Sequence, residues 1–339
     1  MLGTSSFYQP IGRDAGIDWA AIGTGSRDAL VNFLKTLVPV RDTLRRTHLY
    51  AESWLRPQLA TGMARITATA AESDYFVSNM KMVMRRGDAI LPGAAVTYDP
   101  PHAVEDLARY GTQAHQGRIL DLVAMNRALV DPDGAWGAEY RFTGFWADPA
   151  GSDWTPPPGL ARFLEDGPPP VVVTMGSMVM FDVERLVDHV RRALRLTGQR
   201  GIVVGGWSGI APGDAPDDGL WRAGDVPYDW LFPRASCVIH HGGCGTVGAV
   251  LRAGRPSILL PQIAAQEAFG AMLRREGLAT GVFDVQALDP DALAAAIRAA
   301  VADERCRKTA RRWQEVVAGE GGVARAAELI ERHADGLGR

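Results

Sequence analysis

The stretch Cys237–Thr246, with the sequence CVIHHGGCGT, decides the fold class predicted for the second half of the chain. A short apolar run ends in two histidines and a turn with three glycines, and apolar residues at helical spacing follow. This order predicts a buried strand at Cys237–Ile239, a tight turn and a helix that begins at about Thr246. Free backbone N–H groups and the helix dipole in such a turn suit a phosphate or diphosphate. The alternative is a tight turn whose histidine is satisfied internally, and glycines alone do not decide between the two.

Strands and helices alternate on both sides of this stretch. Before it, the β-branched run Val171–Thr174 predicts a strand, and apolar residues spaced by three and four within 183–194 predict an amphipathic helix. After it, PSILLP (256–261) predicts another buried strand and residues 266–276 another helix. Short loops join these elements, which predicts an α/β fold with a parallel sheet covered by helices on both faces. Ligands bind such sheets at the carboxyl ends of the strands.

The first half of the chain is less regular. Strands are predicted at Ile17–Ile22, in DYFVSN (74–79) and in GAAVTYDPP (93–101). A long helical stretch is predicted from about Ser26 to Thr61, with prolines that interrupt it.

Length and composition fit a globular protein with two domains. The chain has 339 residues, of which 47% are hydrophobic and 22% charged. The stretch DPAGSDWTPPP (148–158) is rich in proline and has little periodicity, which predicts a linker. We therefore expect one domain at residues 1–147 and a second at 148–339.

Charge and hydropathy exclude several classes of protein. The net charge of −3 argues against nucleic acid as a partner. The longest apolar stretch, Val171–Phe181, is shorter than the roughly 18 residues of a membrane span, and the first residues lack the features of a signal peptide. The three cysteines, Cys237, Cys244 and Cys306, form no CxxC pair, so neither a disulfide framework nor a zinc site is indicated. These observations predict a cytoplasmic protein without an integral membrane segment.

Two further stretches contain candidate binding residues. In the turn Thr174–Met178, the Ser177 hydroxyl could reach a phosphate or a sugar, or could cap the next helix. In GDVPYDWLFPRA (224–235), Val226 and Tyr228 could form a flat edge against a nucleobase, or could belong to the core. Both pairs of alternatives stay open at the level of sequence.

Several stretches, in this order, resemble those of nucleotide-sugar-dependent glycosyltransferases with the GT-B architecture. They are FTGFW (142–146), PPGLARFLEDGPPPVVVTMGSM (157–178) and DVPYDWLFPRASCVIHHGGCGTVGAVLRAGRPSILLPQIAAQ (225–266). The resemblance is strongest to the group that includes sterol glucosyltransferases and bacterial enzymes that glycosylate antibiotic aglycones. It implies two Rossmann-like domains that face a cleft. The acceptor would bind to residues 1–147, and the nucleotide-sugar donor would bind to residues 148–339, which include the C-terminal helices.

The resemblance implies that the glycine-rich turn binds the donor diphosphate. His241 corresponds to the histidine that contacts this group. Four residues correspond to the loop that supplies amides and a hydroxyl to it: Gly243, Cys244, Gly245 and Thr246. An anionic leaving group needs such donors and dipoles rather than a protein base.

The remaining donor-binding residues are also implied by the resemblance. Val226 and Tyr228 correspond to positions beside the base, and Ser177 to a residue near the diphosphate or sugar. Gln266 corresponds to the second residue of an Asp-Gln pair that hydrogen-bonds sugar hydroxyls. Ala265 stands where the family has the aspartate, so one carboxylate-to-hydroxyl hydrogen bond is lost.

The beginning of the chain departs from the family pattern. The sequence LGTSSFYQPIGRDAGIDW resembles the part that follows the first strand–helix–strand unit. We therefore expect about 30 residues of the family pattern to be absent and the N-terminal domain to be incomplete, either because translation begins upstream of Met1 or because the protein is a degenerate relative. The turn that contains the family's general base belongs to that unit, so we name no catalytic base. Nothing in the sequence beside His48, His102 or His115 forms a base–orienter pair.

These observations predict an inverting glycosyltransferase. It would move a sugar from a UDP- or dTDP-sugar to a hydroxyl of an apolar small-molecule acceptor, either a natural-product aglycone or a sterol-like molecule. The resemblance also implies that no metal and no other cofactor is needed, because helix dipoles and His241 would stabilise the diphosphate. Met80, Met82 and Met84 could line the acceptor pocket or belong to the core. The alternative is a non-catalytic nucleotide-sugar-binding auxiliary protein or a degenerate relative; an epimerase or hydrolase would need acid–base residues that the sequence does not indicate.

Overall fold

The computed structural model describes residues 2–5, 19–23, 76–85, 89–97, 119–134, 136–138, 140–147, 154–178, 182–206 and 210–336. The chain forms two compact units that alternate along the sequence. The first comprises Met1–Val123, Gly137–Arg141 and Ala326–Arg339, and the second comprises Ala124–Trp136 and Phe142–Arg325. This grouping follows proximity in space rather than a single cut in the chain, so the predicted domains 1–147 and 148–339 stay a prediction.

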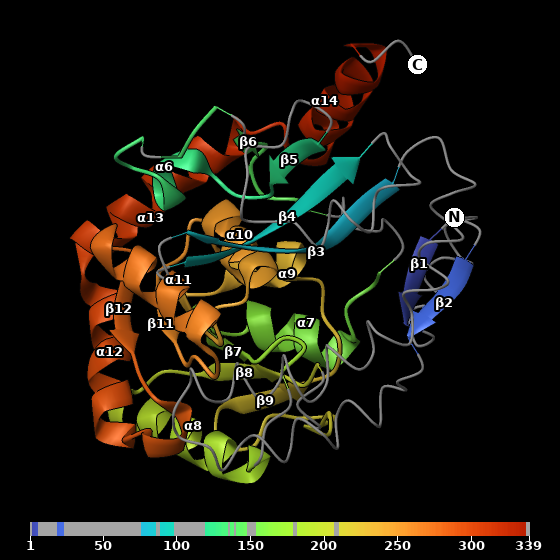
Figure 1. Cartoon of the computed structure of the whole chain (residues 1–339). Coiled ribbons are helices and arrows are strands. Elements are labelled where there is room, and N and C mark those ends of the chain that lie inside the picture. Colours follow the sequence, from blue (N-terminus) through green and yellow to red (C-terminus); the bar gives the residue numbers. More distant parts are fainter. Residues whose placement is uncertain are drawn as a thin grey trace. The chain divides into compact units, whose positions relative to one another are not determined.

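The second unit contains a six-stranded parallel sheet (Figure 1). Its strands are β7 (Val171–Thr174), β8 (Gly201–Val204), β9 (Leu220–Ala223), β10 (Cys237–His240), β11 (Ser257–Leu259) and β12 (Ala279–Val282). They are arranged in the order β12-β11-β10-β7-β8-β9, and all neighbouring pairs are parallel. This is the doubly wound arrangement. The strands follow one another outward in one direction from β7 and in the other from β10, and this switch in strand order opens a crevice at the carboxyl ends of β7 and β10.

Helices of the second unit cover both faces of this sheet. The helices of this unit are α6 (Arg127–Val130), α7 (Pro158–Glu165), α8 (Val183–Thr197), α9 (Tyr228–Leu231), α10 (Cys244–Ala253), α11 (Ala264–Arg275), α12 (Pro290–Ala302), α13 (Glu304–Ala318) and the start of α14 (Gly322–Gly336). Two short 3-10 helices, Phe232–Arg234 and Val285–Ala287, lie between them in the chain.

Alternate residues of β7 face two separate cores. Val171 and Val173 are buried in a cluster with residues of α8 and α12. Val172 points the other way, into a cluster with residues of α7, α9 and α10. Figure 1 shows α8 and α12 on one side of strands β7–β9, and α9 and α10 on the other. Successive side chains of a strand point to opposite faces of the sheet. The three consecutive valines of β7 can therefore all be buried only because helices cover both faces of the sheet.

Local signals in the sequence set the ends of α8. The Asp182 carboxylate accepts a hydrogen bond from the Arg185 N–H at 2.9 Å and caps the first turn. Gly198 ends the helix with φ of 63°, a left-handed conformation that favours glycine.

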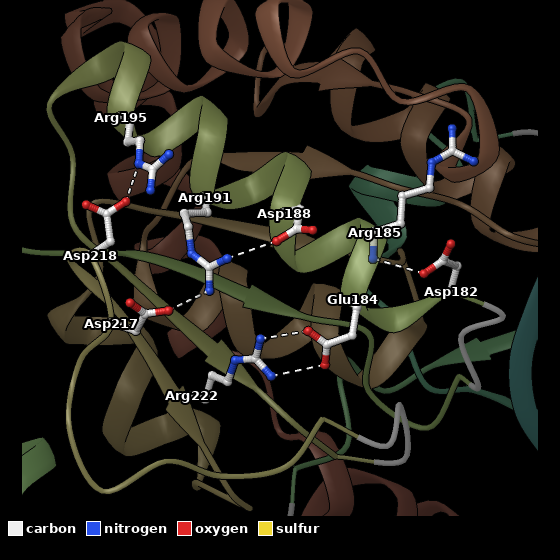
Figure 2. A network of polar contacts seen from close by, with 9 residues as sticks. All are labelled: Asp182, Glu184, Arg185, Asp188, Arg191, Arg195, Asp217, Asp218 and Arg222. Carbon is white, nitrogen blue, oxygen red and sulfur yellow. Dashed lines mark hydrogen bonds and ion pairs between the residues drawn. The ribbon is translucent and has the colours of Figure 1, made fainter.

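The polar side of α8 binds the segment that leads into β9 (Figure 2). Arg222 of β9 donates two hydrogen bonds to Glu184, at 3.1 and 2.8 Å, and this contact lowers the pKa of the Glu184 carboxyl. Arg191 bridges to Asp217 at 2.9 Å. Each pair has an exposed carboxylate, so we expect each to contribute little alone, but together they attach β9 and the loop before it to the helix.

The first unit contains two sheets. Strands β1 (Leu2–Ser5) and β2 (Trp19–Gly23) form a parallel pair. A second sheet has the order β3-β4-β5-β6, with β3 (Phe76–Arg85), β4 (Ala89–Thr97), β5 (Ile119–Val123) and β6 (Tyr140–Phe142). β4 is antiparallel to both β3 and β5, a pairing that the sequence did not indicate.

The three strands predicted in the first half overlap β2, β3 and β4. Met80, Met82 and Met84 lie on β3. The predicted helical stretch 26–61 and the histidines His48, His102 and His115 lie outside the described residues. Among the helices that the structure describes, none is both long enough and apolar enough to cross a membrane.

Candidate functional site

A pocket of about 850 Å³ lies at the carboxyl ends of β7, β8, β9 and β10. Eight of the nine predicted donor-binding residues line it: Ser177, Val226, Tyr228, His241, Gly243, Cys244, Gly245 and Thr246. They come from three separate strand ends and lie together because the strands are parallel and adjacent. The position is the one where doubly wound sheets bind ligands.

The N-terminus of α10 presents free backbone donors to this pocket. Gly243 is the N-cap, no side chain caps the helix, and no acidic residue lies in its first turn. The helix begins at Cys244, two residues before the predicted start at Thr246. A Cβ atom at Gly245 would meet no other atom within 4 Å, so the first turn is open. Open N–H groups together with the positive end of the helix dipole form an anion site.

His241 lies between two glycines at the wall of the pocket. A Cβ atom would lie 2.7 Å from the His241 Cε1 if built on Gly176, and 2.2 Å from its Nε2 if built on Gly243. The side chain is only 5% exposed, and Nδ1 has no hydrogen-bond partner among the described residues. Burial lowers the pKa of His241 to about 4, so the imidazole is neutral at neutral pH. A buried polar atom without a partner beside an open helix N-terminus is typical of a ligand-binding site, so His241 is a candidate to bind an anion.

His240, the preceding residue, has its hydrogen bonds satisfied within the protein. The Gly242 N–H donates to His240 Nδ1 at 3.2 Å. The other nitrogen, Nε2, therefore holds the proton and donates to Ser257 Oγ at 3.2 Å. Burial lowers the pKa of His240 to about 3. The sequence left open whether the histidine of this turn binds a phosphate or is satisfied within the protein. The two possibilities apply to different residues: His240 is satisfied within the protein, and His241 is available to a ligand.

Tyr228 belongs both to the core and to the pocket wall. Its hydroxyl lies 2.8 Å from Thr174 Oγ1, and it also contacts Thr246. Its ring stacks on Phe232, with centroids 4.4 Å apart and planes 14° apart. Burial raises the pKa of the Tyr228 phenol, which stays protonated. Val226 is likewise buried in the core cluster while it lines the pocket.

Gln266 is the one predicted residue that does not line the pocket. It is 5% exposed, and its Oε1 accepts a hydrogen bond from the Gln262 N–H at 2.7 Å. Its side chain therefore closes the turn between β11 and α11. The contact with a sugar that the resemblance implies for Gln266 stays a prediction.

Cys244 contributes its backbone to the site rather than a reactive thiol. Its Sγ lies 3.8 Å from the Ala124 carbonyl oxygen, and burial raises its pKa to about 12. A neutral, buried thiol is a poor nucleophile.

Sequence reasoning missed four large side chains at the pocket: Trp146, Trp154, Asp229 and Arg252. The Trp154 ring lies 4.9 Å from that of Trp230. Arg252 donates to Asp229 at 3.2 Å, and its Nη1 is buried with no partner among the described residues. Helical spacing could have identified Arg252, because it lies seven residues after Gly245 and so on the same face of α10.

Within the part of the chain that the structure describes, no group of three or more His, Cys, Asp or Glu side chains is placed to hold a metal ion.

Comparisons with known proteins confirm the resemblance to glycosyltransferases. A family described as "Erythromycin biosynthesis protein CIII-like, C-terminal domain" matches residues 213–330. An O-mycaminosyltylonolide 6-deoxyallosyltransferase from Streptomyces fradiae is 40% identical over 202 residues, which are 59% of this chain and 46% of that protein. A sterol 3-beta-glucosyltransferase from Arabidopsis thaliana is 30% identical over 223 residues, which are 66% of this chain and 35% of that protein. The chain thus spans less than half the length of these curated relatives.

Solved structures show the fold class. A calicheamicin glycosyltransferase is similar with a TM-score of 0.59 at 18% identity, covering 99% of this chain and 90% of that chain. The glycosyltransferase of kitacinnamycin is similar with a TM-score of 0.53 at 19% identity, covering 96% of this chain and 73% of that chain. These similarities confirm the GT-B architecture expected from the sequence.

Proposed function

We propose that this chain is a glycosyltransferase whose pocket between β7, β10 and α10 binds the nucleoside diphosphate of a sugar donor. The observation that supports this most is the uncapped N-terminus of α10 beside His241, a buried histidine with an unpartnered nitrogen. Both features stabilise negative charge, and both border the same pocket. The relatives named as glycosyltransferases support the same class of reaction.

The geometry fits the departure of a diphosphate. In the proposed inverting reaction, an acceptor hydroxyl attacks the anomeric carbon while the bond from that carbon to the diphosphate oxygen breaks. The electron pair leaves with the diphosphate, whose charge grows as the bond breaks. Amide groups at Gly243–Thr246 and a hydrogen bond from His241 would stabilise that charge. His241 acts here as a donor, because its low pKa makes it a weak base.

The rest of the pocket offers surfaces that suit a nucleoside. Trp154 and Val226 provide apolar walls, and Asp229 and Arg252 provide an acceptor and a donor. Along α10, Arg252 lies about two helical turns from the diphosphate-binding end, roughly 10 Å along the axis. This distance is comparable to the length of a nucleoside measured from the diphosphate to the far edge of the base. We propose UDP or dTDP as the nucleotide.

The acceptor is proposed from the relatives. The names of the relatives give O-mycaminosyltylonolide and sterols as their acceptors. We propose an acceptor of this class, a natural-product aglycone or a sterol-like molecule, and a soluble protein that meets it in the cytoplasm.

Titration calorimetry with UDP, dTDP, ADP and the matching sugar nucleotides tests the donor site. We expect a pyrimidine nucleoside diphosphate to bind and His241→Ala to weaken that binding. His189→Ala is the matched control, since His189 lies on α8 and does not line the pocket. Equal affinity of His241→Ala and the unchanged chain would contradict the assignment of the site. Transfer of a radiolabelled sugar to macrolide and sterol acceptors then tests the reaction, and nucleotide binding without transfer to any acceptor would favour a binding protein.

A further inference from the structure

A single carboxylate joins two segments that are far apart in the sequence. Asn126 Nδ2 donates to Glu320 Oε1 at 2.6 Å, and the Phe145 N–H donates to Glu320 Oε2 at 3.0 Å. Each carboxylate oxygen therefore has one donor, and all three residues belong to the second unit. Hydrogen bonds to an ionised group are among the stronger ones in proteins.

The turn after α13 holds the Phe145 segment from a second side. The Gly322 N–H donates to the Thr143 carbonyl oxygen at 2.8 Å. Between these contacts, Gly144 has φ of 86°, and a Cβ atom there would lie 2.5 Å from the Glu320 Cβ. The backbone of Gly144 therefore packs directly on Glu320. This contact and the two hydrogen bonds on either side of it fix residues 143–145 against the turn after α13.

This segment forms part of the proposed donor pocket. The Phe145 ring packs on α10, where a Cβ atom at Gly248 would lie 2.7 Å from the ring. The next residue, Trp146, lines the pocket, and its Nε1–H donates to Thr143 Oγ1 at 2.8 Å. Contacts thus run from Glu320 to the Phe145 amide and on to the indole in the pocket wall.

We propose that Glu320 is a positioning residue for the nucleotide pocket. By binding Asn126 and the Phe145 N–H, it holds Trp146 in the wall and the Phe145 ring against α10. The inference rests on the proposed function of that pocket, since it assigns Glu320 an effect on nucleotide affinity without contact to the nucleotide. Glu320 lies after α13 and does not line the pocket.

A double-mutant cycle tests whether Glu320 acts through Trp146. Glu320→Ala should raise the Kd of UDP or dTDP, whichever the unchanged chain binds more tightly, by about tenfold, a size within the range of coupling energies between residues in contact. Trp146→Ala should weaken binding as well, and Glu320→Ala should add little in that background. Additive effects would overturn the proposal. So would an unchanged Kd with a lower thermal midpoint, which is the result of a merely structural role.

Exchanging the hydrogen-bond donor and acceptor between positions 126 and 320 should restore nucleotide binding that the single variants lose. In Glu320→Gln, the single amide oxygen can accept from only one of the two donors, so the amide N–H group faces either Asn126 Nδ2 or the Phe145 N–H. Asn126 Oδ1 cannot accept instead, because it already accepts the Leu129 N–H at 3.1 Å. In Asn126→Asp, two carboxylates face each other. The double variant Glu320→Gln/Asn126→Asp restores one donor and one acceptor, and leaves an oxygen for the Phe145 N–H. We expect each single change to weaken binding and the double variant to return to within about twofold of the unchanged chain. A double variant no better than the singles would overturn the proposal.

Hydrogen exchange separates this inference from the proposed function. In Glu320→Ala, a peptide covering residues 142–147 should exchange faster, and the double variant should restore the slow rate. If the unchanged chain binds no nucleoside diphosphate but exchange responds in this way, the proposed function fails while the positioning of Trp146 by Glu320 stands. Unchanged exchange in Glu320→Ala would overturn the positioning role, whatever the chain binds.

Discussion

The β10–α10 turn and the β11–α11 turn lie at the same edge of the six-stranded sheet, but their backbone N–H groups have different surroundings. After β10, no side chain caps α10, and its first turn borders the pocket. After β11, the Gln266 side chain folds back and accepts the N–H of Gln262, and neither residue lines the pocket. Both turns join a parallel strand to a helix. Neither helix has a side-chain N-cap, and the two differ in that only the N-terminus of α10 borders the pocket. The comparison teaches that an uncapped helix N-terminus becomes a candidate anion site only where it faces a pocket.

The largest effect is expected from closing the β10–α10 turn. Gly243→Ala should raise the Kd of the nucleoside diphosphate by about 100-fold, because the added Cβ overlaps His241, which Gly176 confines on its other side. Titration calorimetry measures this change. Gly213→Ala is the matched control, since Gly213 does not line the pocket and a Cβ there would lie no closer than 3.6 Å to another atom. Equal losses in the two variants would contradict the steric argument.

The adjacent histidines should respond differently to removal. His241→Ala should weaken nucleotide binding by about 1.5–3 kcal/mol, the range for a hydrogen bond to a charged group, with little effect on stability. His240→Ala should instead lower the free energy of unfolding by about 1–3 kcal/mol, because the Gly242 N–H and Ser257 lose a buried partner. Calorimetry and urea unfolding measure the two effects. Loss of stability in His241→Ala with unchanged binding would reverse the assignment.

Acid should destabilise the free protein through these two histidines. Burial lowers the pKa of His241 to about 4 and of His240 to about 3, from an ordinary value of 6.5. At pH values between 6.5 and about 4, the unfolded chain binds more protons at these histidines than the folded chain does. The free energy of unfolding should therefore fall as the pH falls below 6.5. His241→Asn should make this dependence shallower in urea unfolding followed from pH 8 to about 4. A bound diphosphate favours the charged imidazole, so nucleotide binding should take up protons at acid pH.

The smallest effects are expected in the β11–α11 turn. Gln266→Ala should change the Kd of the bare nucleoside diphosphate by less than about twofold, while it lowers the free energy of unfolding by about 1 kcal/mol through the Gln262 N–H. Ala265→Asp tests the role implied by the resemblance. It should increase the affinity for a sugar nucleotide relative to the bare diphosphate, because a carboxylate-to-hydroxyl hydrogen bond is charge-assisted. An unchanged ratio of these affinities in Ala265→Asp would argue against a sugar contact at this turn.

Much of the second unit could be predicted because its signals are local. The runs at Val171–Thr174 and Cys237–His240 are continuous and apolar, and they form the two central strands β7 and β10. The strands β9 and β12, LWRA and ATGV, were missed because four residues without alternation contain no periodic signal. Their place is set by pairing with β8 and β11.

The sequence by itself determined the alternation of strands and helices around β7, β10 and β11 and the glycine-rich turn at the end of β10, because apolar periodicity and glycine preference act over a few neighbouring residues. Only the tertiary structure decided which of two adjacent histidines stays free, that Gln266 closes its own turn, and that Trp154 and Arg252 face the pocket. It also brought Glu320 to the Phe145 N–H, 175 residues away in the chain. Hydrogen bonds form only when donor and acceptor come within about 3 Å, and that distance is set by the packing of the whole unit rather than by any one segment.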